Sequence, residues 1–183
     1  MRMTLLLATL AIGLPFLISF YATPARVGFA VSERFLERLN VIPEINENKV
    51  EPITATTLRA WAEKNESAAT QYAQRVLPLD VAYLFVLGGF LCLASLTLAR
   101  LVAWPDSLSS IAQLCWTLPA LYIASDLCED VLIAVLLSFR PMITDASVLV
   151  LQVCKVIKIT SVGLSLALVV VLGLLSFVWK HAP

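Results

Sequence analysis

Four long apolar stretches run through the chain, separated by segments that hold most of its charges. They cover residues 1–21, 79–104, 109–139 and 146–179. A helix that crosses a bilayer needs about 20 consecutive, mostly apolar residues. The pattern therefore predicts an all-α membrane protein: a four-transmembrane-helix bundle with a helical extramembrane segment between its first and second spans.

The first stretch carries Arg2 ahead of an apolar run from Thr4 to Tyr21. Two interpretations fit: a retained signal anchor, or a cleaved secretory signal, because small residues follow the run at 22–25. The run exceeds the roughly 7–15 apolar residues of an ordinary secretory signal. We interpret 1–21 as transmembrane helix 1, a signal anchor, and keep cleavage as the alternative.

Residues 22–78 form the polar part of the chain. Apolar residues recur there at helical spacing twice, over 31–42 and from Leu58 to Arg75, with charged residues between them. This spacing predicts two amphipathic helices in an extramembrane segment. Their apolar faces would lie on the membrane surface or cap the bundle.

The composition narrows the function classes. The chain is 60% hydrophobic and 14% charged, with 13 basic and 13 acidic residues, so no net basic field exists to attract nucleic acid. Its one histidine is His181, near the C-terminus, which removes the usual ligands of haem and zinc. We expect no cofactor and no protein-bound metal. The four cysteines lie in apolar stretches without CxxC spacing and are interpreted as small buried hydrophobes.

The third apolar stretch contains three carboxylates where a span should carry none. At 100° per residue, Tyr122, Asp126, Glu129 and Asp130 fall on one face of a helix. Ionised side chains in the middle of a span each cost several kcal/mol unless they are paired or hydrated. This helix therefore needs partners, protonation or water.

The fourth stretch supplies partners in Lys155 and Lys158. Counted from the turn at 140–145, Asp130 lies about 15 Å along the third helix and Lys155 about 14 Å along the antiparallel fourth. The two sets of charges are thus predicted at the same depth. Three acids against two lysines leave one negative charge over, to be balanced by a proton or another cation.

Asp80 and Tyr83 stand at the start of the second stretch, on the side of the membrane that holds the 22–78 segment and the 140–145 turn. We therefore place them at the mouth of the predicted cavity. Asp126 and Glu129 are our candidates for acid and base, with Asp130, Lys155 and Lys158 tuning them and Asp80 acting as a gate. Arg140 is an additional partner at the rim. The candidate substrate-binding side chains are Tyr83, Tyr122, Gln152 and Arg75.

These polar positions resemble a group of small bacterial four-span membrane proteins of unknown function. The likeness covers roughly residues 53–175 and rests on Thr56 to Tyr72, then Arg75, Asp80 and Tyr83, then Asp126-x-x-Glu129-Asp130 and a lysine early in the last helix. That group typically shows D-x-x-E-N, so Asp130 adds a charge. The resemblance implies that Asp80, Asp126, Glu129 and a lysine act as a set, and it implies no activity.

Three functions remain open. The first is an acid–base enzyme acting on a lipid or isoprenoid-like, lipophilic substrate, because paired carboxyl groups in different environments suit proton transfer. The second is a proton- or cation-coupled transport or channel subunit. The third is a non-catalytic assembly subunit whose charges latch helices together or contact a membrane partner. A homo-oligomer is also left open.

The orientation of the protein in the membrane is predicted from the short segments that flank the spans. Arg2, Arg100 and Lys180 lie on one side of the predicted spans. Basic residues in short flanks mark the cytoplasmic side, whereas long loops count little. We therefore expect a multi-pass protein of the bacterial inner membrane, with both termini in the cytoplasm and membrane lipid around it.

Overall fold

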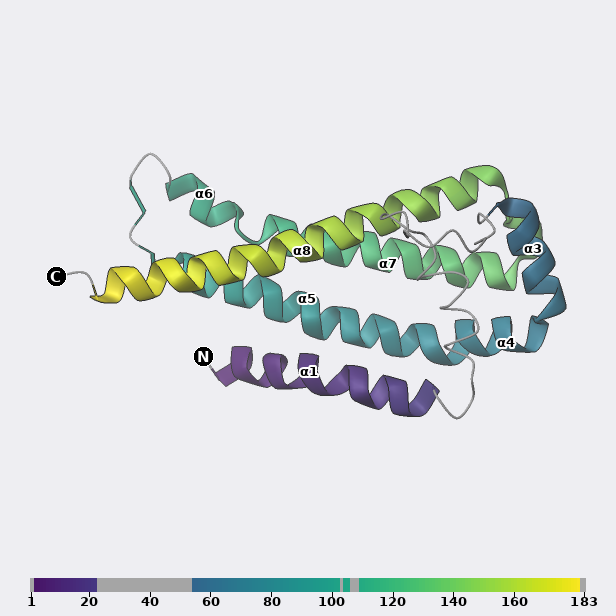
Figure 1. Cartoon of the computed structure of the whole chain (residues 1–183), viewed down its shortest axis with the longest axis horizontal. Helices are drawn as coiled ribbons and strands as arrows, with labels where there is room; N and C mark the ends of the chain where they lie inside the picture. Colours follow the sequence, from purple (N-terminus) through teal and green to yellow (C-terminus); the bar gives the residue numbers. More distant parts are fainter. Residues whose placement is uncertain (1, 23–53, 103, 106–108, 182–183) are drawn as a thin grey trace, which may run out of the picture.

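The computed structural model describes residues 2–22, 54–102, 104–105 and 109–181 of the 183-residue chain. No strand occurs in these ranges, so the all-α prediction is confirmed. The amphipathic helix predicted over 31–42 lies outside them. The elements, labelled in Figure 1, are α1 (Arg2–Ala22), α3 (Ala55–Lys64), α4 (Glu66–Gln71), the π-helix η1 (Tyr72–Val76), α5 (Leu77–Ala99), α6 (Ser109–Leu114), α7 (Thr117–Ser138), the 3-10 turn η3 (Arg140–Met142) and α8 (Asp145–His181).

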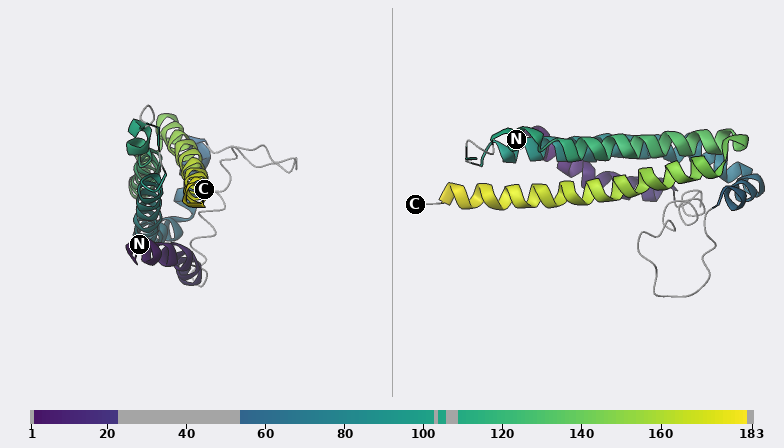
Figure 2. Two further views of the ribbon diagram at one scale, coloured as in Figure 1. Left: turned by 90° about the vertical axis from the view of Figure 1, so that its left-hand side faces the viewer. Right: turned by 90° about the horizontal axis from the view of Figure 1, so that it is seen from above.

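Three long helices, α5, α7 and α8, lie side by side and contact one another, and α1 packs along α5. The chain runs back and forth along them, so α7 and α8 are antiparallel and meet at the short turn η3 (Figure 1). The start of α1 and the end of α8 lie at the opposite end of the molecule from this turn. Figure 2 shows the same arrangement from the end and from above.

The short helix α3 crosses the end of the molecule where α7 turns into α8, and α4 leads from it toward α5 (Figure 1). We call this pair the end cap. The Arg59 guanidinium donates a hydrogen bond to the Ile143 carbonyl, with 2.5 Å between nitrogen and oxygen. Arg140 pairs with Glu66 at 2.7 Å. Beneath these bonds, Leu58, Ala62 and Ala69 of the end cap share one buried apolar core with residues of α7, α8 and the turn between them. These are Ile133, Leu136, Ile143 and Leu151. The end cap thus closes one end of α7 and α8.

The end cap differs from the single amphipathic helix predicted from Leu58 to Arg75. α3 ends at Lys64, and both the backbone N–H and the side-chain amide of Asn65 donate to the Trp61 carbonyl. An Asn side chain competes in this way with the helical hydrogen-bond pattern. After α4, the wider π-helical turn η1 leads directly into α5. The apolar spacing predicted the buried face but not the break.

The third apolar stretch also differs from the prediction of one helix interrupted at Pro119. The break lies earlier, in a turn at Cys115 and Trp116, and Pro119 stands in the first turn of α7. A proline lacks the N–H that an interior helical position must donate, whereas the first turn needs no such donor. The proline therefore belongs to the start of α7.

Two neighbouring glycines set the spacing of the helices around α5. A Cβ atom on Gly88 would overlap the side chain of Ile123 on α7, so only glycine permits this approach. A Cβ atom on Gly89 would meet Leu7 of α1 at 3.8 Å, an ordinary contact. Gly88 therefore brings α5 and α7 close together, beside the functional site described below.

Two helical segments among the described residues are long and apolar enough to cross a membrane: Tyr72–Ala99 and Asp145–Trp179. In the first segment only 28% of the apolar part is buried inside the protein, and in the second only 17%. Large apolar side chains such as Phe85, Val170 and Phe177 are more than half exposed. The helix surfaces are therefore apolar on the outside as well as in the core.

Candidate functional site

Three carboxylates project from the middle of α7 into the protein. Glu129 comes three positions after Asp126, and Asp130 comes directly after Glu129. This spacing places the three side chains on one face of the helix. They are buried, with 4%, 0% and 3% of their surface exposed. Buried carboxylates are costly unless they find partners, so their surroundings indicate what the site can do.

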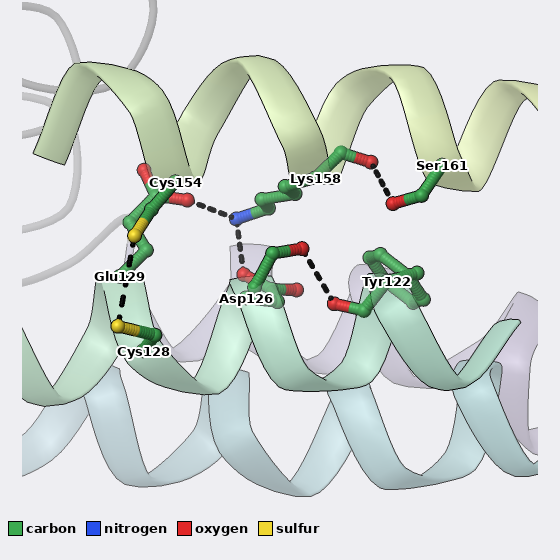
Figure 3. Close-up of polar contacts among 8 residues, drawn as sticks. Tyr122, Asp126, Cys128, Glu129, Cys154, Lys158 and Ser161 are labelled. Carbon is green, nitrogen blue, oxygen red and sulfur yellow. Dashed lines mark hydrogen bonds and ion pairs between the residues drawn. The ribbon is translucent and has the colours of Figure 1, made fainter. Parts of the chain in front are cut away.

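Lys158 of α8 is the partner of the first two carboxylates. Its ammonium forms ion pairs with Asp126 and with Glu129, the latter at 3.1 Å between Nζ and Oε2. Figure 3 shows the lysine reaching from α8 to both side chains on α7. One cation therefore bridges two anions across the contact between these helices.

The count that matched Asp130 with Lys155 also puts Lys158, about 20 Å from the turn along α8, at the depth of Asp126, about 21 Å from it along α7. The acids and lysines therefore meet at matching depth. Lys158 is the lysine that bridges Asp126 and Glu129. Lys155 is 7% exposed and interacts electrostatically with Glu129.

Asp130 is the carboxylate that the lysines do not bridge. Among the described residues its Oδ2 atom has no hydrogen-bond partner, and no ion pair within 4.0 Å reaches it. Its strongest electrostatic neighbour is Asp80 on α5, followed by Asp126. Asp80 in turn interacts with Lys158 and with Asp126. Asp80 therefore belongs to the cluster itself, which we call the carboxylate–lysine cluster.

With Asp80 included, the cluster holds four carboxyl groups, of residues 80, 126, 129 and 130, and two ammonium groups, of residues 155 and 158. If all six were ionised, two negative charges would be unbalanced, one more than the sequence suggested. Within the described ranges, no group of three or more ligating side chains is arranged to hold a metal ion. A proton or a further cation would balance the site.

Three tyrosines surround the cluster. Tyr122 is 3% exposed and close enough to Asp126 to interact with its carboxylate, and Tyr83, half-buried, faces Asp80 and Asp126. Tyr72 is 2% exposed, and its strongest electrostatic partner is Asp80, followed by Asp130.

Sequence reasoning placed Tyr72 only on an apolar face and missed it as a site residue. An unbroken α-helix would separate Tyr72 from Asp80 by eight residues and about 80° around the axis. The wider turn of η1 changes that register, and π-helical turns of this kind frequently occur at functional sites. A π-helical turn leaves no pattern in the sequence by which this could have been found.

Two of the predicted binding residues lie apart from the cluster. Arg75 is exposed and Gln152 is half-buried, and across the described part of the chain no hydrogen bond or ion pair joins either one to the carboxylates. Arg140, predicted as an additional partner, pairs instead with Glu66 of the end cap. The structure therefore reduces the site to groups on α5, α7, α8 and η1.

The cysteines differ from the prediction of four buried hydrophobes. Cys115 and Cys154 are buried, but Cys92 is half-buried and Cys128 is exposed. Cys154 donates a hydrogen bond to Cys128, with 3.6 Å between the sulfur atoms of α8 and α7 (Figure 3). Counting from the turn puts Cys128 about 18 Å along α7 and Cys154 about 13 Å along α8, so depth alone does not predict this contact.

The cluster lies nearer the end-cap end of α5 and α8 than their other end. Beyond it, away from the end cap, 81–91, 109–125 and 159–179 contain no Asp, Glu, Lys, Arg or His. Buried hydroxyl groups are found there instead: Ser125 donates to the Tyr122 carbonyl and Ser165 to that of Ser161. The ionisable groups thus form a one-sided site and not a chain between the two ends.

Comparisons with known proteins add no relative: no protein-family model, no curated protein and no solved structure matches this chain. The likeness to small bacterial four-span proteins therefore stays a prediction. Function has to be argued from the cluster.

Proposed function

We propose that this chain is a four-span integral membrane protein whose carboxylate–lysine cluster performs acid–base chemistry on a lipophilic substrate. The spans would be α1 as a signal anchor, the segment containing α5, then α7 and α8. Support comes from the outward-facing apolar side chains of the two longest apolar helices, which water would not solvate favourably. Support for α7 comes from its position against both of these helices.

The orientation proposed for this protein puts both termini in the cytoplasm of a bacterium and the end cap outside the inner membrane. It rests on Arg2, Arg100 and Lys180 at one end of the helices. The cluster then lies closer to the outer face. A substrate dissolved in the outer leaflet would reach it from that side.

The observation that carries the proposal is the contrast between Asp130 and its neighbours. Lys158 pairs with Asp126 and Glu129 and favours their ionised forms. Asp130 lacks such a partner and faces Asp80. Lys158 acts on Asp80 and Asp130 electrostatically but forms its ion pairs with Asp126 and Glu129. Two neighbouring carboxyl groups without an ion pair of their own favour holding one proton between them. We therefore assign the proton donor to Asp130, and we assign Asp126 and Glu129, with Lys158, to stabilising positive charge that develops on the substrate.

This assignment revises the roles expected from the sequence, in which Asp126 and Glu129 were acid and base. The change follows from Lys158: a carboxylate bound to an ammonium group is a poor proton donor. A proton relay across the membrane is less well supported, because 81–91, 109–125 and 159–179, between the cluster and the termini, contain no Asp, Glu, Lys, Arg or His.

A second function is favoured by the double ion pair itself. Lys158 joins two carboxylates of α7 to α8, which is the arrangement expected of a structural latch between helices. In that case the cluster would fix helix pairing, or a contact with a partner subunit, and perform no chemistry. The two functions differ in the role of Asp130, because a latch made by Lys158 does not require it.

Native mass spectrometry of the protein purified from its own membranes distinguishes the acid–base function from the structural latch. The comparison is wild type against Asp130→Asn, with Asp145→Asn as matched control, since Asp145 is exposed at the start of α8. We expect a lipophilic molecule bound to the protein whose identity or amount changes in Asp130→Asn and not in the control. The same lipid profile in all three proteins, with a partner subunit lost only from Lys158→Met, would instead establish the latch.

A further inference from the structure

Cys128 and Cys154 form a pair with a different chemistry from the carboxylates beside them. Their sulfur atoms are 3.6 Å apart, and the Cys154 thiol donates to Cys128. Each cysteine immediately precedes a cluster residue, Glu129 on α7 and Lys155 on α8. A disulfide requires about 2.05 Å between sulfur atoms, so a shift of about 1.5 Å separates the observed contact from a covalent bond.

The two thiols differ in access. Cys128 is exposed on the outer surface of α7, whereas Cys154 is 9% exposed, between the helices. An accessible cysteine with a second thiol beside it is the usual arrangement of a redox-active pair, in which the first reacts and the second resolves the product. Cys128 would be the reacting thiol and Cys154 the resolving one.

We propose that Cys128 and Cys154 are a thiol pair that reduces organic hydroperoxides dissolved in the membrane and closes a disulfide between α7 and α8. Oxidants of this class reach Cys128 because it is exposed near the middle of α7, whose outer face also carries the exposed apolar side chains of Leu121 and Val131. This part of the argument rests on the membrane location proposed above. It does not depend on the acid–base chemistry, which uses other groups.

The reaction balances without a cofactor. The Cys128 sulfur attacks the terminal peroxide oxygen, the O–O bond breaks, and the alcohol leaves with the proton of the thiol, which gives a sulfenic acid. The Cys154 sulfur then attacks the Cys128 sulfur, and water leaves with the second thiol proton. One hydroperoxide is reduced by two electrons to an alcohol and water, and two thiols are oxidised to one disulfide.

The disulfide would tie α7 to α8 at the level of the carboxylate–lysine cluster. The helices are joined by η3 and packed along their length. The covalent bond would prevent them from separating where Lys158 bridges Asp126 and Glu129. The redox state of the lipid phase would thereby determine whether this part of the site can open.

The test treats the full-length protein in detergent with cumene hydroperoxide, which partitions into micelles, and separately with hydrogen peroxide, which stays in water. The products are denatured and digested with chymotrypsin, which cleaves after Phe139 between the two cysteines, and linked peptides are identified by mass spectrometry. We expect two of the four thiols to be lost and an α7 peptide to be linked to an α8 peptide through Cys128 and Cys154. Cumene hydroperoxide should do this several-fold faster.

Variants separate the pair from the other cysteines. Cys92→Ser and Cys115→Ser should still form the link, and Cys128→Ser should not. In Cys154→Ser the sulfenic acid should persist on Cys128 and be trapped by dimedone. The proposal is overturned if wild type keeps four free thiols, if the link involves Cys92 or Cys115, or if hydrogen peroxide reacts as fast as cumene hydroperoxide. None of these outcomes bears on Asp130, so the two proposals fail independently.

Discussion

Lys158 of α8 reaches across to Glu129 of α7, with 3.1 Å between its ammonium nitrogen and the Oε2 atom, and the same ammonium also pairs with Asp126. The Glu129 side chain is 1% exposed, so water cannot replace the lysine. Removing one member of a buried ion pair leaves an uncompensated charge. Lys158 is therefore expected to be required for the stability of the α7–α8 contact.

The first prediction concerns this contact. Lys158→Met should lower the free energy of unfolding by about 3–5 kcal/mol, because two buried carboxylates lose their common cation. The measurement is denaturant or thermal unfolding in detergent, followed by circular dichroism. Combining the change with Asp126→Asn and Glu129→Gln should restore most of the loss, since no buried charge then lacks a partner. Lys64→Met, at an exposed position, is the control. An unchanged stability of Lys158→Met would contradict the buried ion pair.

Much of this contact could be predicted from the sequence because it depends on two regular quantities, the rise per residue and the rotation per residue of an α-helix. Those quantities placed Asp126, Glu129 and Asp130 on one face and brought the lysines of the last helix to their depth. They could not decide between Lys155 and Lys158. The choice depends on the rotation of α8, which packing determines.

Irregular backbone accounts for the features that the sequence did not reveal. The register change at η1, which turns Tyr72 toward Asp80, has no signature in the order of residues. The break at Asn65 depends on a side chain that folds back onto Trp61. The apolar runs, by contrast, predicted the ends of α8 to within two residues and those of α5 to within five, because length and hydrophobicity largely define them.

The second prediction concerns Asp130. Asp130→Asn should leave the protein as stable as wild type or raise its free energy of unfolding by about 1 kcal/mol, because a buried carboxyl group without a cation partner is replaced by a neutral amide. Asp126→Asn should lower the same quantity, because it removes one partner of Lys158. Thermal unfolding of the three proteins side by side measures the difference. If Asp130→Asn is as destabilised as Asp126→Asn, Asp130 is part of the ion-pair network and not the proton donor.

The third prediction compares the two adjacent glycines of α5. Gly88→Ala should cost about 1–3 kcal/mol, because its Cβ atom overlaps Ile123. Gly89→Ala should be neutral or stabilising, because its Cβ atom makes only an ordinary contact with Leu7. Both changes gain the same helix propensity, so the difference between them reports packing alone. In Gly88→Ala combined with Ile123→Ala, the cost should be less than the sum of the single changes. Additive costs would show that α5 and α7 are not in close contact at Gly88.

The fourth prediction concerns the end cap, which two arginines fasten in different ways. Arg59 donates to the backbone carbonyl of Ile143, whereas Arg140 pairs with Glu66, whose side chain is 72% exposed. A hydrogen bond from a charged donor contributes about 1.5–3 kcal/mol, and an exposed ion pair under about 1 kcal/mol.

Arg59→Met should therefore speed amide hydrogen exchange in α3 and α4, and Glu66→Gln should change it little. The readout is exchange mass spectrometry of peptides that cover 54–71, with α8 peptides from 159–179 as the internal reference, because they lie far from the end cap. If α3 and α4 exchange their amide hydrogens as slowly in Arg59→Met as in Glu66→Gln, apolar contacts, chiefly those of Leu58 and Ala62, hold the end cap without the arginine. Faster exchange confined to Arg59→Met would show that one bond to the α7–α8 turn controls how readily this end of the molecule opens.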